Sequence, residues 1–337
     1  MLEGDKGYPH ITGRQPGEID KDGVNRMAST VQCLGYKAFG LQILSEFPLP
    51  ELPRTEQPGR LGSVSVVEAD LSERWEAIPK ISPNLGMAEQ EVMFMVKGTA
   101  VFSIQNGSTI TVSPAVHADP DSIRLFILGS CMGVLLMQKG VLALHGSSLV
   151  LENKAYALVG RSGAGKSTLA SYLMDQGHLL VSDDVIPVLV HNGTPLAVPG
   201  YPQQKLWQQS LDYLGMNSSA YRPLFKRETK FAIPVHDRFQ AEPLPLAGIF
   251  ELSVQDGPVS VEAISGLERL HTLYNHTYQK ALVDPMGVRE WHFGMLASFV
   301  NRLPMYRLTR PEQGFSAPQQ TELIFETITQ KVKEMKI

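Results

Sequence analysis

Hydrophobic and polar residues follow two different patterns along the chain, and the change falls near residue 140. In residues 30–130, short apolar runs are separated by Pro and Gly, which predicts a series of short β-strands. The clearest prediction is a hairpin, because the alternating runs 101–105 and 108–112 flank Asn106 and Gly107, a pair suited to a type I′ turn. The first part of the chain is therefore expected to be a small β-rich domain.

Beyond residue 140, strand-like runs alternate with helical periodicity, a pattern typical of α/β domains. The apolar segment 122–138 predicts a buried helix that leads into this second domain, with a strand pair as the alternative. We expect strands at 146–151, 155–159, 179–181 and 185–190, and helices at 167–176 and 319–336.

These patterns divide the chain into three segments. Residues 1–26 contain few large apolar residues and no periodicity, so we expect a disordered tail or an artificial extension. Residues 27–139 form the predicted β-rich domain, and residues 140–337 form the predicted α/β domain. Two domains also agree with a length of 337 residues.

Composition and charge exclude several classes of protein. Because 43% of the chain is hydrophobic, we expect a buried core. Because no run of 18 apolar residues occurs, we expect no membrane span. The net charge of −4 provides no basic field for nucleic acid or an anionic membrane. Cys33 and Cys131 are too few for a disulfide framework, and we expect both to be buried in a cytoplasmic protein without a signal peptide. A homo-oligomer is left open.

A glycine-rich motif lies between a predicted strand and a predicted helix. Residues 160–168 match G-x-x-x-x-G-K-[ST] at every fixed position. In such a loop, Lys166 would reach the β and γ phosphates and the Ser167 hydroxyl would bind Mg²⁺. The sequence predicts a site for ATP or another nucleoside triphosphate, the alternative being a turn that binds nothing. Its residues are Gly160, Arg161, Ser162, Gly163, Ala164, Gly165, Lys166, Ser167 and Thr168.

An acidic pair, Asp183 and Asp184, follows the next predicted strand. Phosphoryl transfer needs one carboxylate as a base and uses another near Mg²⁺, although a solvated turn is the alternative. Neighbouring residues of an extended strand point to opposite faces, so both carboxylates reach one site only if the strand ends or bends there. His145, 21 residues before Lys166, is a further candidate, but a lone histidine is more often structural.

These motifs together resemble the catalytic core of the HPr kinase/phosphorylase family. The resemblance rests on His145 and the strand after it, the loop 160–168, and the segment 177–184, which reads Gly-His-Leu-Leu-Val-Ser-Asp-Asp. It implies an α/β P-loop nucleotide-binding domain, like the C-terminal domain of HPr kinase, preceded by a small β-rich domain. By position, Asp184 resembles the family's base, with Asp183 as the competing candidate and as a metal ligand beside Ser167. Lys166 and His145 resemble the supporting catalytic residues.

The chain departs from that family after the acidic pair. In place of a Glu-Ile-Arg-Gly-like signature, which is linked to recognition of HPr, residues 199–207 read Pro-Gly-Tyr-Pro-Gln-Gln-Lys-Leu-Trp. The overall layout, including residues 36–41, 129–133 and 201–207, is more similar to HPr-kinase-related proteins found with peptide-maturation genes, a group that includes the lasso-peptide precursor kinases. That resemblance implies transfer of phosphate from ATP to the C-terminal serine of a precursor peptide. An HPr-type kinase, a small-molecule kinase and an ATP-gated peptide-binding module remain alternatives.

Other polar and aromatic residues are weaker candidates. Four cations could grip the phosphates or an acidic peptide, or could form a solvated face: Arg222, Lys226, Arg227 and Lys230. Trp207 and Tyr201 could stack on a base, although such residues more often fill a core. The His- and Tyr-rich stretch 271–278 matches no metal-ligand spacing, so no direct role is expected for it.

Overall fold

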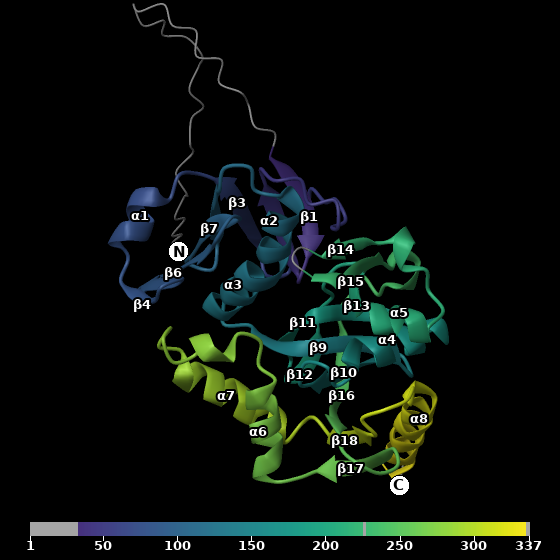
Figure 1. Cartoon of the computed structure of the whole chain (residues 1–337). Coiled ribbons are helices and arrows are strands. Elements are labelled where there is room, and N and C mark those ends of the chain that lie inside the picture. The colour runs from purple at the N-terminus through teal and green to yellow at the C-terminus, as the bar shows by residue number, and fades with distance from the viewer. Residues whose placement is uncertain (1–32, 225–226, 335–337) are drawn as a thin grey trace, which may run out of the picture. The chain divides into compact units, whose positions relative to one another are not determined.

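A computed structural model describes residues 33–224 and 227–334 (Figure 1). The predicted tail, residues 1–26, lies outside the described residues. The protein is a mixed α/β structure with a β-rich N-terminal region. Its strands fall into three sheets within the described part of the chain.

The N-terminal sheet has the strand order β1-β2-β3-β8-β7-β6-β5-β4. The predicted hairpin is confirmed, because β7 and β8 pair Gln105 with Thr109, while Asn106 and Gly107 adopt φ angles of 53° and 60°. Helix α1, Ser72–Ala77, lies between β3 and β4 in the sequence. The strands are β1 Leu34–Ala38, β2 Leu41–Ser45, β3 Ser63–Glu68, β4 Lys80–Ser82, β5 Leu85–Ala88, β6 Glu91–Val96, β7 Ala100–Gln105 and β8 Thr109–Pro114.

A long apolar helix follows this sheet, and the alternative of a strand pair is wrong. Helix α2, Pro120–Phe126, passes through the π-helical turn Ile127–Cys131 into α3, Met132–Gln138. The Asp119 carboxylate caps it by accepting from the amides of Asp121 and Ser122. By length and composition this helix could cross a membrane, which corrects the expectation from apolar run length. Of the 18-residue stretch of this helix that is apolar enough, 67% is buried inside the protein, as is usual for a core helix.

The second sheet has the order β10-β9-β11-β12-β16-β18-β17, and β10 also pairs in parallel with β16. This pairing closes five strands into a ring, with β18 and β17 extending beyond β16. Its strands are β9 Leu142–Leu151, β10 Lys154–Gly160, β11 Leu180–His191, β12 Thr194–Ala197, β16 Leu244–Val254, β17 Ser260–Ile264 and β18 Met305–Arg310.

A third, small sheet has the order β13-β15-β14: β13 Gln203–Trp207, β14 Arg222–Leu224 and β15 Arg227–Pro234. The predicted helix at 167–176 is confirmed as α4, Lys166–Asp175, and the last predicted helix as α8, Ala317–Glu334. The other helices are α5 Gln208–Tyr213, α6 Leu267–Asn275 and α7 Arg289–Val300, with single 3₁₀ turns at Ser218–Ala220, His236–Arg238 and Lys280–Leu282.

The buried core explains which elements hold together. One apolar cluster combines the N-terminal strands and the long helix with Val141 and Val185, so it crosses the predicted boundary at residue 140. A second cluster packs α4 and α8 against the ring and the small sheet. The division into two domains stays a prediction. Cys131 is buried as expected, but Cys33 is exposed, which corrects that expectation because Cys33 precedes the first strand.

Candidate active site

The glycine-rich loop joins β10 to α4, as the sequence predicts. Gly160 and Gly165 have φ angles of 151° and 98°, which side chains with a Cβ rarely adopt. A Cβ at Gly160 would also lie 2.7 Å from the carbonyl oxygen of Leu252. Lys166 begins the helix, and its Nζ donates to the carbonyls of Gly160, at 2.8 Å, and Arg161, at 3.1 Å. The loop is therefore held in a tight path around its own lysine.

Arg310, at the end of β18, braces this loop from the other side. Its Nε donates to the Ala164 carbonyl at 2.9 Å and its Nη2 donates to the Gly163 carbonyl at 3.1 Å. These bonds hold the Gly163 and Ala164 carbonyls toward Arg310. Because the N–H and C=O groups of a trans peptide point in opposite directions, the N–H groups of the same peptides point away from Arg310. The sequence analysis did not single out Arg310, because 142 or more residues separate it from the loop and no motif marks it.

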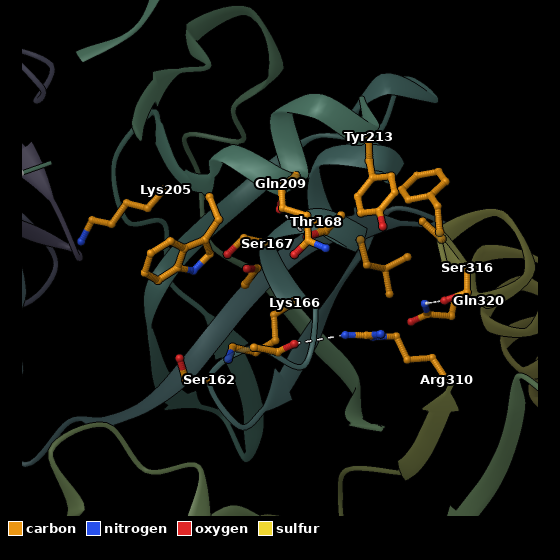
Figure 2. Close-up of a pocket in the computed structure, with 18 of the residues that line it drawn as sticks. Ser162, Lys166, Ser167, Thr168, Lys205, Gln209, Tyr213, Arg310, Ser316 and Gln320 are labelled. Atoms are coloured by element: carbon orange, nitrogen blue, oxygen red, sulfur yellow. Dashed lines mark hydrogen bonds between the residues drawn. The ribbon is translucent and has the colours of Figure 1, made fainter. Parts of the chain in front are cut away.

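A cavity of about 530 Å³ lies in front of the loop (Figure 2). Figure 2 shows Arg310 extended toward the loop on one side of the cavity and Lys205 on the opposite side. The predicted residues Ser162, Gly163, Gly165, Lys166, Ser167, Thr168, His145, Asp183, Asp184 and Lys230 all line it. Tyr213, Phe315 and Gln320 line its other end, so aromatic and polar groups face each other across it. Its size and lining are typical of a small-molecule site.

The acidic pair reaches this cavity because the strand bends at Asp184. Strand β11 continues through the pair, with Asp183 opposite Ser147 and Asp184 opposite Gly146. Asp184, however, has a φ of 70°, a left-handed conformation that is uncommon for a residue with a side chain. The bend interrupts the strict alternation of side chains, and both carboxylates line the cavity. The sequence argument required such a bend, while the prediction of two separate strands is corrected to one continuous strand.

The two carboxylates have different surroundings. Asp183 Oδ1 accepts from the Ser147 hydroxyl at 2.6 Å and Oδ2 accepts from the Lys205 amide at 2.9 Å. Burial raises the pKa of Asp183, and these two hydrogen bonds only partly oppose it. Asp184 Oδ2 instead accepts from Lys205 Nζ at 2.7 Å, and Oδ1 lies 3.5 Å from His145 Nδ1. Burial opposes ionisation of Asp184, but the charge of Lys205, together with the neighbouring His145 ring, holds its pKa well below the usual range.

Lys205 is the principal site residue that sequence reasoning missed. It is buried in β13, and the Asp184 carboxylate raises its pKa well above the ordinary value although burial acts in the opposite direction. The signal available in the sequence was a lysine between apolar and aromatic residues in a strand-like run, which is a weak one. Lys205 therefore remains protonated and fixes the Asp184 carboxylate as an anion.

His145 packs at the edge of the same cluster. Its Nδ1 lies 3.0 Å from the carbonyl oxygen of Asp184, which can only accept, so Nδ1 carries the proton of the neutral ring. Burial lowers the pKa of His145. Its backbone amide donates to the His276 carbonyl at 2.7 Å, and its ring lies 5.8 Å from that of Tyr278. The stretch 271–278 thus contacts the backbone and the ring of His145, a structural contribution that the sequence did not indicate.

Of the four predicted cations, Lys230 and Arg222 have described side chains, and they line different cavities. Lys230 lines the cavity with its Nζ 5.4 Å from the centre of the Trp207 ring. Arg222 pairs with Asp121 at 3.1 Å and does not line this cavity. Lys226 lies outside the described residues, and Arg227 is described only as the first backbone position of β15. Tyr201 is buried with its ring edge against Phe39, as in a core.

The donors in the cavity fit a triphosphate and a magnesium ion. Lys166 supplies a positive charge at the start of α4, although burial lowers its pKa against the opposing effect of the two aspartates. Ser167 and Asp183 supply oxygen ligands of the kind that Mg²⁺ prefers, and phosphates and water usually complete its shell. Within residues 33–224 and 227–334, no group of three or more His, Cys, Asp or Glu side chains is arranged to hold a metal alone.

Comparison with known proteins finds a distant likeness to a solved structure. No protein-family model matches the chain, and no curated protein matches its sequence. Among solved structures, the chain is similar to the HPr(Ser) kinase/phosphatase from Coxiella burnetii, with 16% sequence identity, over 57% of this chain and 98% of that one, and a TM-score of 0.29. A TM-score this low supports no argument about the site. The likeness names the family that the sequence resembles, and the precursor-peptide type stays a prediction.

Proposed function

We propose that this protein is a magnesium-dependent kinase that transfers the γ-phosphoryl group of ATP to the C-terminal serine of a precursor peptide. The P-loop interpretation of residues 160–168 is part of this proposal. The observation that carries it is the approach of both acidic side chains, Asp183 and Asp184, to the cavity in front of that loop. A site that only bound nucleotide would not need a carboxylate pair held by a buried lysine.

The proposed reaction is an in-line displacement. The serine Oγ attacks the γ-phosphorus, a new O–P bond forms, and the bond from that phosphorus to the β,γ-bridging oxygen breaks, so that ADP leaves with the electron pair. The hydroxyl proton passes to Asp184. When bound, Mg²⁺ neutralises charge on the β and γ phosphates, with Ser167 and Asp183 as its protein ligands. Lys166 and the loop amides orient the same phosphates.

Asp184 suits the role of base better than Asp183. Both oxygens of Asp183 accept hydrogen bonds from the protein, which favours a fixed ligand. Asp184 is ionised, and its Oδ1 has only the longer 3.5 Å approach of His145. A carboxylate with a low pKa is a weak base, so we expect proton transfer late in the displacement, after the serine oxygen has begun to bond to phosphorus.

Mass spectrometry tests the proposal. The protein is incubated with ATP, Mg²⁺ and a peptide that ends in serine, beside the same peptide ending in alanine and beside HPr. We expect a gain of roughly 80 Da, one phosphate, on the serine peptide alone. Addition of phosphate to HPr instead would replace the peptide by the carrier protein as the acceptor. Binding of ATP without phosphate on either acceptor would contradict the proposal and favour a small-molecule kinase or a binding module.

A further inference from the structure

One face of the small sheet connects the proposed active site to a second cavity. In β13, Gln203, Lys205 and Trp207 alternate onto one face, opposite Pro234, Ala232 and Lys230 of β15. The other face of β15 presents Phe231, Ile233 and Val235, which are buried in the core. Alternation therefore leaves one face for a ligand, since its Pro234 and Trp207 are exposed and Ala232 is half-buried.

The two ends of this face line two different cavities. Lys205, Trp207 and Lys230 line the cavity with the glycine-rich loop. Gln203, Ala232 and Pro234 line a second cavity of about 310 Å³. Asp121, Arg124 and Leu125 of α2 also line that second cavity, and the 3.1 Å ion pair between Asp121 and Arg222 joins α2 to β14.

The chemistry of the second cavity favours an apolar side chain with a backbone attached. Leu125 of α2 and Leu128 of the following π-helical turn, with Tyr201 and Tyr221, provide its apolar walls. Its two arginines already pair with its two carboxylates, because Arg124 binds Glu51 at 2.8 Å and Arg222 binds Asp121, while the other oxygen of Glu51 accepts no hydrogen bond among the described residues. A ligand with a bare charge would have to compete with these pairs, whereas an apolar side chain would not.

The spacing along the strands sets the length of the ligand. Extended chain rises about 3.3 Å per residue, so Gln203 lies about 7 Å along β13 from Lys205, and Pro234 lies about 13 Å along β15 from Lys230. An extended peptide whose last residue is at Asp184 would thus reach the second cavity about two to four residues earlier. Resting on the proposed function, we infer that the second cavity binds the acceptor peptide through an apolar side chain about two to four residues before the accepting serine.

Peptide length and sequence test this inference. Serine-ended peptides of two to eight residues are compared, with leucine or glycine at each upstream position, at saturating ATP. We expect kcat/KM to rise about 10- to 100-fold when a leucine enters the window about two to four residues before the serine, from burial of one leucine side chain, and to level off beyond it.

A charge exchange makes the test specific. Leu125→Glu should lower kcat/KM for the leucine peptide about tenfold or more, leave the KM for ATP unchanged, and favour lysine at that peptide position. Leu267→Glu is the matched control, because Leu267 is 86% exposed and lines neither cavity. If Leu125→Glu misfolds, Ala232→Leu narrows the same cavity from the sheet side and should give the same selective loss.

Two results would overturn the inference, and they differ in what they say of the kinase. Equal turnover of two-residue and eight-residue peptides, or no effect of both Leu125→Glu and Ala232→Leu, would exclude peptide docking in the second cavity while the kinase assignment stands. Failure of wild-type protein to phosphorylate any serine peptide would exclude the proposed function itself, and the docking site with it.

Discussion

The ion pair between Lys205 and Asp184 offers the most direct test of how the site is built. Lys205→Met keeps the length of the side chain and removes its charge, which leaves Asp184 buried beside only His145. Breaking a buried pair by removing one partner typically costs 3–5 kcal/mol. Because 24% of the Asp184 side chain is exposed, water can replace part of the interaction. We therefore expect a loss of about 2–3 kcal/mol in the free energy of unfolding.

Urea unfolding at pH 7, followed by both circular dichroism and tryptophan fluorescence, measures this loss. Agreement of the two probes is needed to treat the transition as two-state. Lys37→Met is the matched control, because Lys37 pairs with Glu242 at 2.9 Å while 46% and 67% of the two side chains are exposed. That surface pair should contribute less than about 1 kcal/mol. The double variant Lys205→Met with Asp184→Asn should recover about half of the loss, since no charge is then left unpaired.

The refuting result is a pattern without coupling. If Lys205→Met costs no more than Lys37→Met, and its effect simply adds to that of Asp184→Asn, the pair does not hold the carboxylate and the account of the site is wrong.

Four further predictions concern Asp184, Lys166 and Arg310. Asp184→Asn should abolish phosphoryl transfer while calorimetry finds ATP affinity largely kept; full activity would exclude Asp184 as the base. The pKa of Asp184 in the folded protein lies below its ordinary value of 3.8. Ionised Asp184 therefore stabilises the fold above pH 3.8, and this stabilisation is lost as the pH falls through the lower, folded pKa. Asp184→Asn should flatten the acid limb of a profile of unfolding free energy against pH. Lys166→Ala should weaken ATP binding and turnover together, and unchanged affinity would contradict the placement of the phosphates. Arg310→Gln should raise the KM for ATP about tenfold with a smaller effect on kcat, because it removes hydrogen bonds to the carbonyls of the glycine-rich loop and leaves the proposed base unchanged. An unchanged KM would show that the loop keeps its shape without Arg310.

Features set by neighbouring residues could be predicted from the sequence. The Asn106 and Gly107 turn and the helix after the glycine-rich loop depend on local backbone preferences, and the structure has both. The acidic pair could be assigned to the site only on the condition of a bend, since an alternating pattern carries no mark of a single left-handed residue.

Features set by long-range contacts could not. The contact of Arg310 with the loop joins residues 146 and 147 positions apart, and the pair of Lys205 with Asp184 depends on how β13 lies against β11. The parallel pairing of β10 with β16 that closes the ring likewise has no local signal. The motifs thus pointed to the loop and the carboxylates, while the residues that hold them in place came only from the fold.

The left-handed backbone at position 184 also decides which substitutions can be interpreted. Asp, Asn and Gly adopt a φ near 70° readily, whereas other side chains pay about 1–2 kcal/mol of strain there. Alanine at position 184 would therefore change the backbone conformation and remove the charge at the same time. Loss of activity in that variant could not be assigned to one of these two effects. Asparagine keeps the shape and removes the negative charge, and glycine removes the whole side chain at the same backbone angles. Both variants keep the path of the chain at position 184, so a loss of activity in either one reports on the carboxylate and not on the backbone that presents it.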